Sequence, residues 1–158
     1  MNQQATLITG FYEGLQRLNA AAMTACYHPE VVFTDAVFQG LKGARACAMW
    51  RMLCERGKDL RVEFRDVQAD ALHGRAHWEA WYTFSGSGRP VHNIIEARFE
   101  FRDGLIWQHR DDFDLHHWAG QALGLTGKLL GGTGLLQNKI RANAAKALDA
   151  YIAGNRKN

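Results

Sequence analysis

The chain has 158 residues, of which 47 % are hydrophobic and 22 % are charged, with a formal net charge of +3. This composition excludes an intrinsically disordered chain, and the length predicts one domain with a sizeable core. The modest charge is spread along the sequence, so we expect no nucleic-acid partner. The apolar stretch at 123–136 is short, rich in glycine and interrupted by Lys128, so we expect no membrane partner either.

The cysteines and the first residues predict a cytoplasmic protein. Cys47 and Cys54 fall two turns apart on one predicted helix, about 10.5 Å between their Cα atoms, which is beyond the reach of a disulfide. The N-terminal residues lack the basic start and the apolar run of a signal peptide. Both features favour a reducing compartment.

The first half of the chain predicts helices around one strand. An opening helix is indicated by apolar residues at helical spacing, namely Leu7, Phe11, Leu15 and Leu18. Asn19 can cap a second, short helix that runs to about residue 27. Alternation then predicts a strand over 31–38, and Gly43 precedes a helix over 44–56.

The second half predicts a sheet followed by a helix. Alternating patterns place strands at 60–69, 75–85 and, as a long hairpin, 93–113. An amphipathic helix is predicted over 135–152. Helices followed by an antiparallel meander with one apolar face indicate the α+β class. We expect a cone-shaped α+β roll over residues 1–118, with the N-terminal helices packed in the concave face of a curved, mainly antiparallel sheet. Residues 119–158 would form an extra C-terminal helical segment of the same domain.

The hairpin allows two registers, which differ in the turn. A two-residue turn at Asp103-Gly104 would set Phe99 against Gln108, an apolar side chain against a polar one. A three-residue loop over 102–104 keeps apolar residues together, and we predict that register. Its pairs are Phe101 with Leu105, Phe99 with Trp107, Ala97 with His109, Ile95 with Asp111, Asn93 with Phe113, Glu96 with Arg110 and Arg98 with Gln108.

His109 and Asp111 stand out because they share the apolar face of this hairpin, about 6.8 Å apart along one strand. Burying an unmatched polar group costs on the order of 1–3 kcal/mol, so a hydrogen bond, a cavity or a ligand must offset the cost. Desolvation raises the pKa of an Asp and lowers that of a His, which suits general acid–base chemistry. The alternative is a structural pair whose hydrogen bonds are satisfied within the fold.

Three segments carry a resemblance to a known superfamily. They are the L-x-x-x-F-Y-x-x-L helix, the Y-H-P-E-V-V-F-T-D-A-V-F-Q-G-L-K-G segment and the F-x-F-R-D-G-L-I end of the meander. Over residues 5–115 the chain resembles the nuclear transport factor 2 superfamily, and within it the SnoaL-like and ketosteroid-isomerase-like proteins. The resemblance implies the α+β roll, but the superfamily hosts unrelated activities.

The resemblance also implies roles for individual residues. Asp35 matches the catalytic base of the isomerases, although Ala36 stands where they have Pro. Phe11 falls near the position of their oxyanion-binding Tyr, with Tyr12 as its neighbour. Their second oxyanion acid would fall near Ala97, which cannot serve. The late-strand position of Asp111 is similar to that of a catalytic Asp in the SnoaL-like cyclases.

Each further candidate has an alternative. Asp35 could instead cap the helix that starts near Ala44, and Tyr12 could be an edge residue of the opening helix. Aromatic residues could line a pocket for a flat apolar ligand or could fill an ordinary core. The substrate-binding candidates are Phe11, Trp50, Trp78, Tyr82, Asn93, Phe99 and Trp107. Too few ligands converge to predict a metal, and no motif indicates a cofactor.

The charged outer face of the meander contains two apolar residues, Trp81 and Ile94, which favours a homodimer through this face. Dimerisation on this side is also common in the superfamily that the chain resembles. We predict cofactor-free acid–base chemistry on a small apolar, possibly polycyclic, carbonyl compound: isomerisation, cyclisation or hydration. The catalytic candidates are Asp111, His109, Asp35 and Tyr12. Whether the chain is an enzyme is left open, because a non-catalytic ligand-binding or dimerisation module of the same fold is the alternative.

Overall fold

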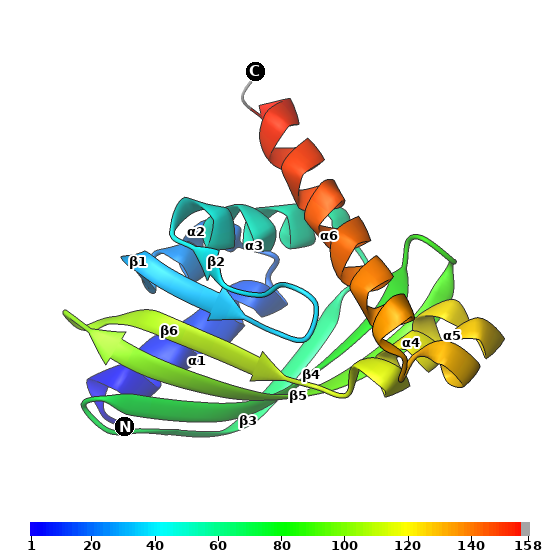
Figure 1. Ribbon diagram of the computed structural model, residues 1–158. Coiled ribbons are helices and arrows are strands. Elements are labelled where there is room, and N and C mark those ends of the chain that lie inside the picture. The colour runs from blue at the N-terminus through cyan, green and yellow to red at the C-terminus, as the bar shows by residue number, and fades with distance from the viewer. Residues whose placement is uncertain (156–158) are drawn as a thin grey trace.

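The computed structural model describes residues 1–155 and shows helices laid against one face of a curved sheet (Figure 1). The helices of the N-terminal half are α1 (Gln3–Gln16), α2 (Ala20–Thr24) and α3 (Ala44–Arg56). The strands are β1 (Tyr27–Thr34), β2 (Leu41–Lys42), β3 (Arg61–Ala69), β4 (His73–Phe84), β5 (Arg89–Arg102) and β6 (Leu105–Asp112). The C-terminal helices are α4 (Leu115–Leu123), α5 (Leu125–Leu130) and α6 (Gly134–Asn155). The last three residues of the predicted extension, 156–158, lie outside the described residues.

The six strands form one sheet in the order β2-β1-β6-β5-β4-β3. All neighbours are antiparallel except β1 and β6, which run parallel and join the start of the chain to the end of the meander. The predicted fold class, an α+β roll with a curved, mainly antiparallel sheet, is therefore confirmed. The division into residues 1–118 and 119–158 stays a prediction.

One face of the sheet is covered and the other is open. Along β5, buried and exposed residues alternate from Val91 to Arg102, as expected for a strand with one buried face. The helix α1 supplies Ile8, Phe11 and Leu15 to the buried side, all fully inaccessible to solvent. Asn2 caps α1 by accepting a hydrogen bond from the backbone N–H of Ala5 (2.8 Å).

The predicted register of the hairpin is wrong. The turn is the two-residue Asp103-Gly104, and both residues have a positive φ (53° and 75°), which matches the twist of the strands. The ladder then shifts between Glu100 and Phe101, and Trp107 is the extra residue of a β-bulge. The pairs after the bulge are Phe99 with His109, Ala97 with Asp111, Arg98 with Arg110 and Glu96 with Asp112.

This bulge resolves the conflict that made the two-residue turn look unfavourable. With the extra residue in the strand, the side chains of His109 and Asp111 still point to the buried face, and the side chain of Trp107 points to the outer face. There, the guanidinium carbon of Arg102 lies 3.8 Å from the centre of the Trp107 ring. Trp107 was predicted to bind substrate, but it therefore lies on the opposite side of the sheet from His109.

The C-terminal helices close one end of the molecule (Figure 1). Asp114 caps α4 through the backbone N–H of His117, and Trp118 of α4 donates a hydrogen bond from Nε1 to Tyr82 Oη (2.7 Å). The long helix α6 slants away from the sheet, and its buried residues are Leu148 and Tyr151. No helix among the described residues combines the length and the apolar character that a membrane crossing requires.

Candidate functional site

His109 and Asp111 lie in the interior, with 1 % and 3 % of their surfaces exposed. The strand β6 positions both, and they belong to a continuous chain of buried hydrogen bonds. His109 Nε2 lies 2.9 Å from Asp111 Oδ1, which also accepts a hydrogen bond from Trp78 Nε1 (3.3 Å). The carboxylate oxygen Oδ1 is thus held by two donors.

The chain continues from the other nitrogen of the imidazole. His109 Nδ1 lies 2.7 Å from Tyr27 Oη, which accepts a hydrogen bond from Trp50 Nε1 (2.8 Å). An indole N–H can only donate, so the Tyr27 hydroxyl is free to donate its own proton to Nδ1. The proton of a neutral imidazole then sits on Nε2, facing Asp111. We call these five residues (Trp50, Tyr27, His109, Asp111 and Trp78) the buried relay.

Tyr27 was not among the predicted site residues. Tyr27 stands at the start of β1, opposite Ile106 in the parallel β1–β6 ladder. Local periodicity does not encode which strands pair in parallel across a distance of 82 residues. Only the sheet order brings the Tyr27 hydroxyl to His109.

Tyr12 lies beside the relay without joining it. Its side chain is fully buried, so it is not an edge residue of α1, and its hydroxyl has no hydrogen-bond partner among the described residues. The ring packs against Trp78 and Phe64, with ring centres 5.7 Å and 5.4 Å away. Burial, together with the nearby charge of Asp111, raises the pKa of Tyr12 well above its usual value. The hydroxyl therefore stays protonated and is an unused donor.

Asp35 and Asp111 line one hollow of about 340 Å³ at the end of β1 and β6. The other residues that border the hollow are Thr34, Ala36, Gln39, Arg110, Asp112, Phe113 and Arg141. Tyr12 and Tyr151 carry the only fully shielded side-chain oxygens or nitrogens without a partner in residues 1–155. Asp111 Oδ2 has no hydrogen-bond partner among residues 1–155 and is not one of these fully shielded atoms, so it keeps some solvent access.

Asp35 stabilises its own turn and does not cap the helix α3. Its Oδ1 accepts hydrogen bonds from the backbone N–H groups of Val37 (2.7 Å) and Phe38 (2.6 Å), whereas Gly43, the N-cap of α3, receives no side-chain hydrogen bond. This turn ends β1 at Thr34, four residues before the predicted end of the strand. Desolvation, with a smaller contribution from the charge of Asp111, raises the pKa of Asp35 to about 7.

The raised pKa makes stability depend on pH in a defined direction. An unfolded Asp releases its proton near pH 4, whereas native Asp35 keeps its proton up to about pH 7. Between these values the native state binds more protons, so the free energy of unfolding contributed by Asp35 falls as pH rises and is level above pH 7. In Asp35→Asn this decrease should be absent. Urea unfolding at several pH values measures it: between pH 4 and pH 7 the free energy of unfolding should fall less in the variant than in the wild type. Parallel profiles would show that the pKa of Asp35 is not raised.

Arg141 reaches the same hollow from α6 and was not among the predicted site residues. Its Nε donates to the backbone carbonyl of Ala36 (3.0 Å) and its Nη1 donates to Asn138 Oδ1 (3.2 Å). The C-terminal extension thus contributes a fixed guanidinium beside two carboxylates. Its helical periodicity predicted α6, but not where α6 would dock.

The predicted aromatic residues mostly fill the core. Phe11, Trp50 and Phe99 surround His109, with ring centres between 4.5 Å and 6.2 Å from the imidazole. Tyr82 is half-buried against Trp118, and Asn93 is buried on β5. None of these five, nor Trp78, borders the hollow beside Asp111. The expected aromatic-lined pocket is replaced there by a largely polar border, because the large rings pack against one another. Within residues 1–155, no three His, Cys, Asp or Glu side chains are grouped closely enough to hold a metal ion.

The fold is shared with several solved structures. An LEH-like epoxide hydrolase from M. tuberculosis is 20 % identical, with a TM-score of 0.62 over 81 % of this chain and 96 % of that one. A protein assigned to the SnoaL-like polyketide cyclases, from Jannaschia sp. CCS1, is 17 % identical, with a TM-score of 0.65 over 75 % and 90 % of the two chains. A protein with a ketosteroid isomerase-like fold from Catenulispora acidiphila, in complex with trimethylamine, is 14 % identical, with a TM-score of 0.65 over 77 % and 95 %.

These identities establish the fold alone. No curated protein matches the chain in sequence. A family model does match: the SnoaL-like domain covers residues 8–109, which is more than half of the chain. The match runs from α1 to His109 and contains Tyr12, Tyr27 and Asp35, while Asp111 lies two residues beyond it. The predicted resemblance is confirmed, and the chain belongs to the SnoaL-like domain family.

Proposed function

We propose that the protein is a cofactor-free acid–base catalyst that acts on a small carbonyl compound by isomerisation, cyclisation or hydration. One observation carries this proposal. Asp111 has one oxygen, Oδ1, fixed in the buried relay, and the residue borders a hollow that it shares with a second carboxylate, Asp35. Two carboxyl groups in unlike environments are a common arrangement for an acid and a base.

The two carboxyl groups have different roles in this proposal. Ionised Asp111 removes a proton from the carbon next to the carbonyl group. His109 orients Asp111 through the hydrogen bond from Nε2, and Tyr27 with Trp50 holds the imidazole in place. Asp35, with its pKa raised to about 7, can carry a proton at neutral pH and donate it to the substrate oxygen.

The surroundings of the hollow define the size and polarity of the substrate. A volume of about 340 Å³ suits a small molecule. Phe113 and Ala36 offer apolar contacts, and Arg141 stabilises negative charge that develops on the oxygen. Tyr12 would serve as a further donor to that oxygen if the substrate reaches the core beside Asp111.

The proposal is tested by following isotope exchange. Small ketones, keto acids and cyclic enones are incubated with the protein in deuterated buffer, and NMR measures the loss of the proton next to the carbonyl. We expect exchange above the buffer rate for at least one compound class. Compounds that bind without exchange would favour the alternative function, a non-catalytic ligand-binding module. That alternative is supported by the relay itself, because its His, Tyr and Trp side chains all have hydrogen-bond partners within the core.

We also propose that the protein is a cytoplasmic homodimer that associates through the open face of the sheet. All three cysteines are unpaired, which is consistent with a reducing compartment. On the open face, Ile94 is 50 % exposed, and Trp81 stacks between His92 and the guanidinium of Arg61. An apolar spot within a charged sheet face favours a second copy as partner.

We expect Ile94→Glu to shift the protein from dimer to monomer, because the substitution places a charge in the apolar centre of the interface. Light scattering coupled to size exclusion gives the mass directly. Leu72→Glu is the matched control, since Leu72 is also exposed but lies in the β3–β4 turn. A wild-type protein that is already monomeric at high concentration would contradict the dimer.

A further inference from the structure

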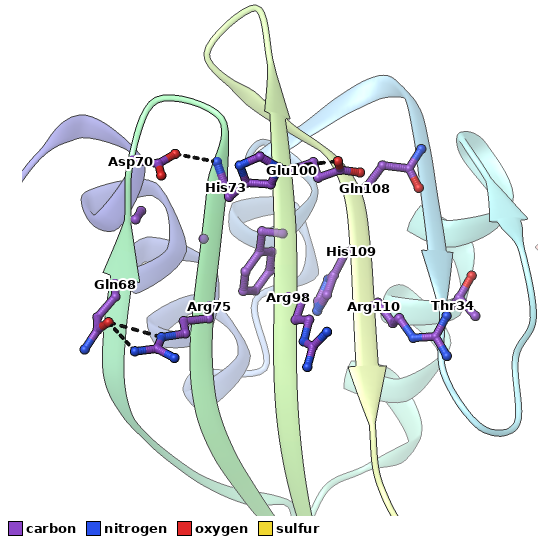
Figure 2. Close-up of a pocket in the computed structure, with 13 residues that line it drawn as sticks. Thr34, Gln68, Asp70, His73, Arg75, Arg98, Glu100, Gln108, His109 and Arg110 are labelled. Atoms are coloured by element: carbon purple, nitrogen blue, oxygen red, sulfur yellow. Dashed lines mark hydrogen bonds and ion pairs between the residues drawn. The ribbon is translucent and has the colours of Figure 1, made fainter.

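Three arginines stand side by side on the open face of the sheet. Arg75 on β4 pairs directly with Arg98 on β5, and Arg98 pairs with Arg110 on β6. The bulge at Trp107 creates this alignment, since the predicted register placed Gln108 opposite Arg98. We call Arg75, Arg98 and Arg110 the arginine row. Figure 2 shows that the row continues to Gln68 on one side and Thr34 on the other, with the helices behind the sheet.

Like charges directly opposite each other destabilise a sheet, so such a row calls for a compensating partner. Arg75 finds a neutral one, since its Nε and Nη2 donate to Gln68 Oε1 (3.1 Å and 2.6 Å). The Nε of Arg110 donates to Asp112 Oδ1 (3.1 Å). The central guanidinium, that of Arg98, makes no hydrogen bond or ion pair within residues 1–155. The row therefore has unused donors at its centre.

The arginine row borders a hollow of about 790 Å³ whose border also contains two acids, Asp70 and Glu100 (Figure 2). Asp70 Oδ1 accepts hydrogen bonds from the backbone N–H groups of Leu72 and His73, both at 2.8 Å. Glu100 lies 3.8 Å from His73 Nε2. Neither carboxylate makes an ion pair with the row, and the three arginines outnumber the two acids, so the formal charge on the border of the hollow is positive.

The dimensions of the row limit what can bind. Strands are about 4.8 Å apart, so the three arginines span roughly 10 Å. The next row along the strands contains Glu96 and Asp112, which stand opposite each other in the β5–β6 ladder. The basic strip is thus one residue wide and is flanked by acids. A nucleic-acid backbone requires a longer track of positive charge, whereas a short anion with two or three phosphates fits.

We propose that the arginine row is a binding site for a diphosphate group, either free or carried by a small organic molecule. Guanidinium groups bind phosphate oxygens through paired hydrogen bonds, and Arg98 at the centre contributes to both phosphates. Arg110 also borders the hollow of Asp35 and Asp111, whereas Arg75 and Arg98 do not. The anion site does not depend on the acid–base proposal. Ile94 lies four residues from Arg98, about 14 Å along β5, which places the arginine row toward the edge of a dimer interface centred on Ile94.

The test is calorimetric titration of the full chain with inorganic pyrophosphate at constant ionic strength. We expect saturable binding that is tighter than that of orthophosphate, and a loss of about tenfold or more in affinity for Arg98→Ala. Arg98→Lys keeps the charge but loses the paired hydrogen bonds, so its affinity for pyrophosphate should lie between that of the wild type and that of Arg98→Ala. Arg51→Ala is the matched control, because Arg51 is an exposed arginine on α3, away from the open face. Its affinity should equal that of the wild type.

Three results would overturn the proposal. Equal weakening by Arg51→Ala and Arg98→Ala would mean that pyrophosphate responds only to the overall charge. The second result has two parts: the wild-type dimer does not bind pyrophosphate, and Arg98→Ala no longer forms the dimer. Together they would show that acids of a second copy occupy the row. Light scattering on the same samples separates this outcome from a loss of anion binding. A short oligonucleotide that binds with higher affinity than pyrophosphate would reassign the surface to nucleic acid.

Discussion

Asp111→Asn is expected to lower the rate of proton exchange by at least about a hundredfold, with little change in stability. An amide cannot accept a proton at neutral pH, so the proposed base is lost. The fold tolerates the change, because the amide oxygen can still accept the hydrogen bonds from His109 Nε2 and Trp78 Nε1. The rate is measured with the substrate class found by isotope exchange, and the unfolding midpoint is measured on the same preparation.

Asp112→Asn is the matched control for this prediction. Asp112 is the next residue on β6, borders the same hollow and has the same side chain, but it points to the open face and pairs with Arg110. The side chains of that pair are 65 % and 46 % exposed, and such a pair contributes little to stability. We expect its exchange rate to stay within about twofold of the wild type, a difference too small to indicate loss of a catalytic base. Equal activity of Asp111→Asn and wild type would remove Asp111 from the mechanism.

The second large effect concerns stability and compares two buried tyrosines. Tyr27→Phe should lower the free energy of unfolding by roughly 2–4 kcal/mol, because it leaves His109 Nδ1 and Trp50 Nε1 buried without a partner. Tyr12→Phe should be neutral or slightly stabilising, because the hydroxyl it removes is buried and has no partner in the described structure. Both substitutions delete one oxygen from a fully shielded ring, so the comparison isolates the hydrogen bonds.

Urea unfolding followed by tryptophan fluorescence measures both variants. A loss of stability in Tyr12→Phe that equals the loss in Tyr27→Phe would contradict the geometry of the relay. The same two variants also separate the roles of the hydroxyls in catalysis. Tyr12→Phe with native stability and reduced exchange would place the Tyr12 hydroxyl against the substrate, whereas unchanged exchange would exclude that role.

The elements that were predicted accurately are those that local sequence patterns indicate. The helix over 44–56 was predicted at its observed bounds, because Gly43 and Gly57 flank an unbroken apolar stripe. The strands of the meander were predicted to within two residues of their ends, since one of their faces is buried and the alternation is strong. The exception is the start of β5, which lies at Arg89, four residues before the predicted start of the hairpin. The strand β1 was displaced, because its end is set by the hydrogen bonds of Asp35 to Val37 and Phe38.

The candidate site was only half visible in the sequence. His109 and Asp111 were evident as ionisable residues on an apolar face, and their burial is as expected. The aromatic residues gave a misleading signal, because the periodicity that places a ring inside does not distinguish a pocket wall from a packed core. Trp107 was misplaced for a different reason: a single bulge reverses the face of a residue without any change in composition.

The fold class, the buried pair on β6 and the family could be predicted from the amino-acid sequence, because hydrophobic periodicity and short motifs are properties of neighbouring residues. Three further features became evident only in the folded chain: Tyr27 completes the relay, Arg141 borders the carboxylates, and three arginines align across the open face. Each of these depends on the pairing of strands or the docking of a helix over long sequence separations. Such contacts depend on how the whole core packs, so they cannot be predicted from the pattern of neighbouring residues.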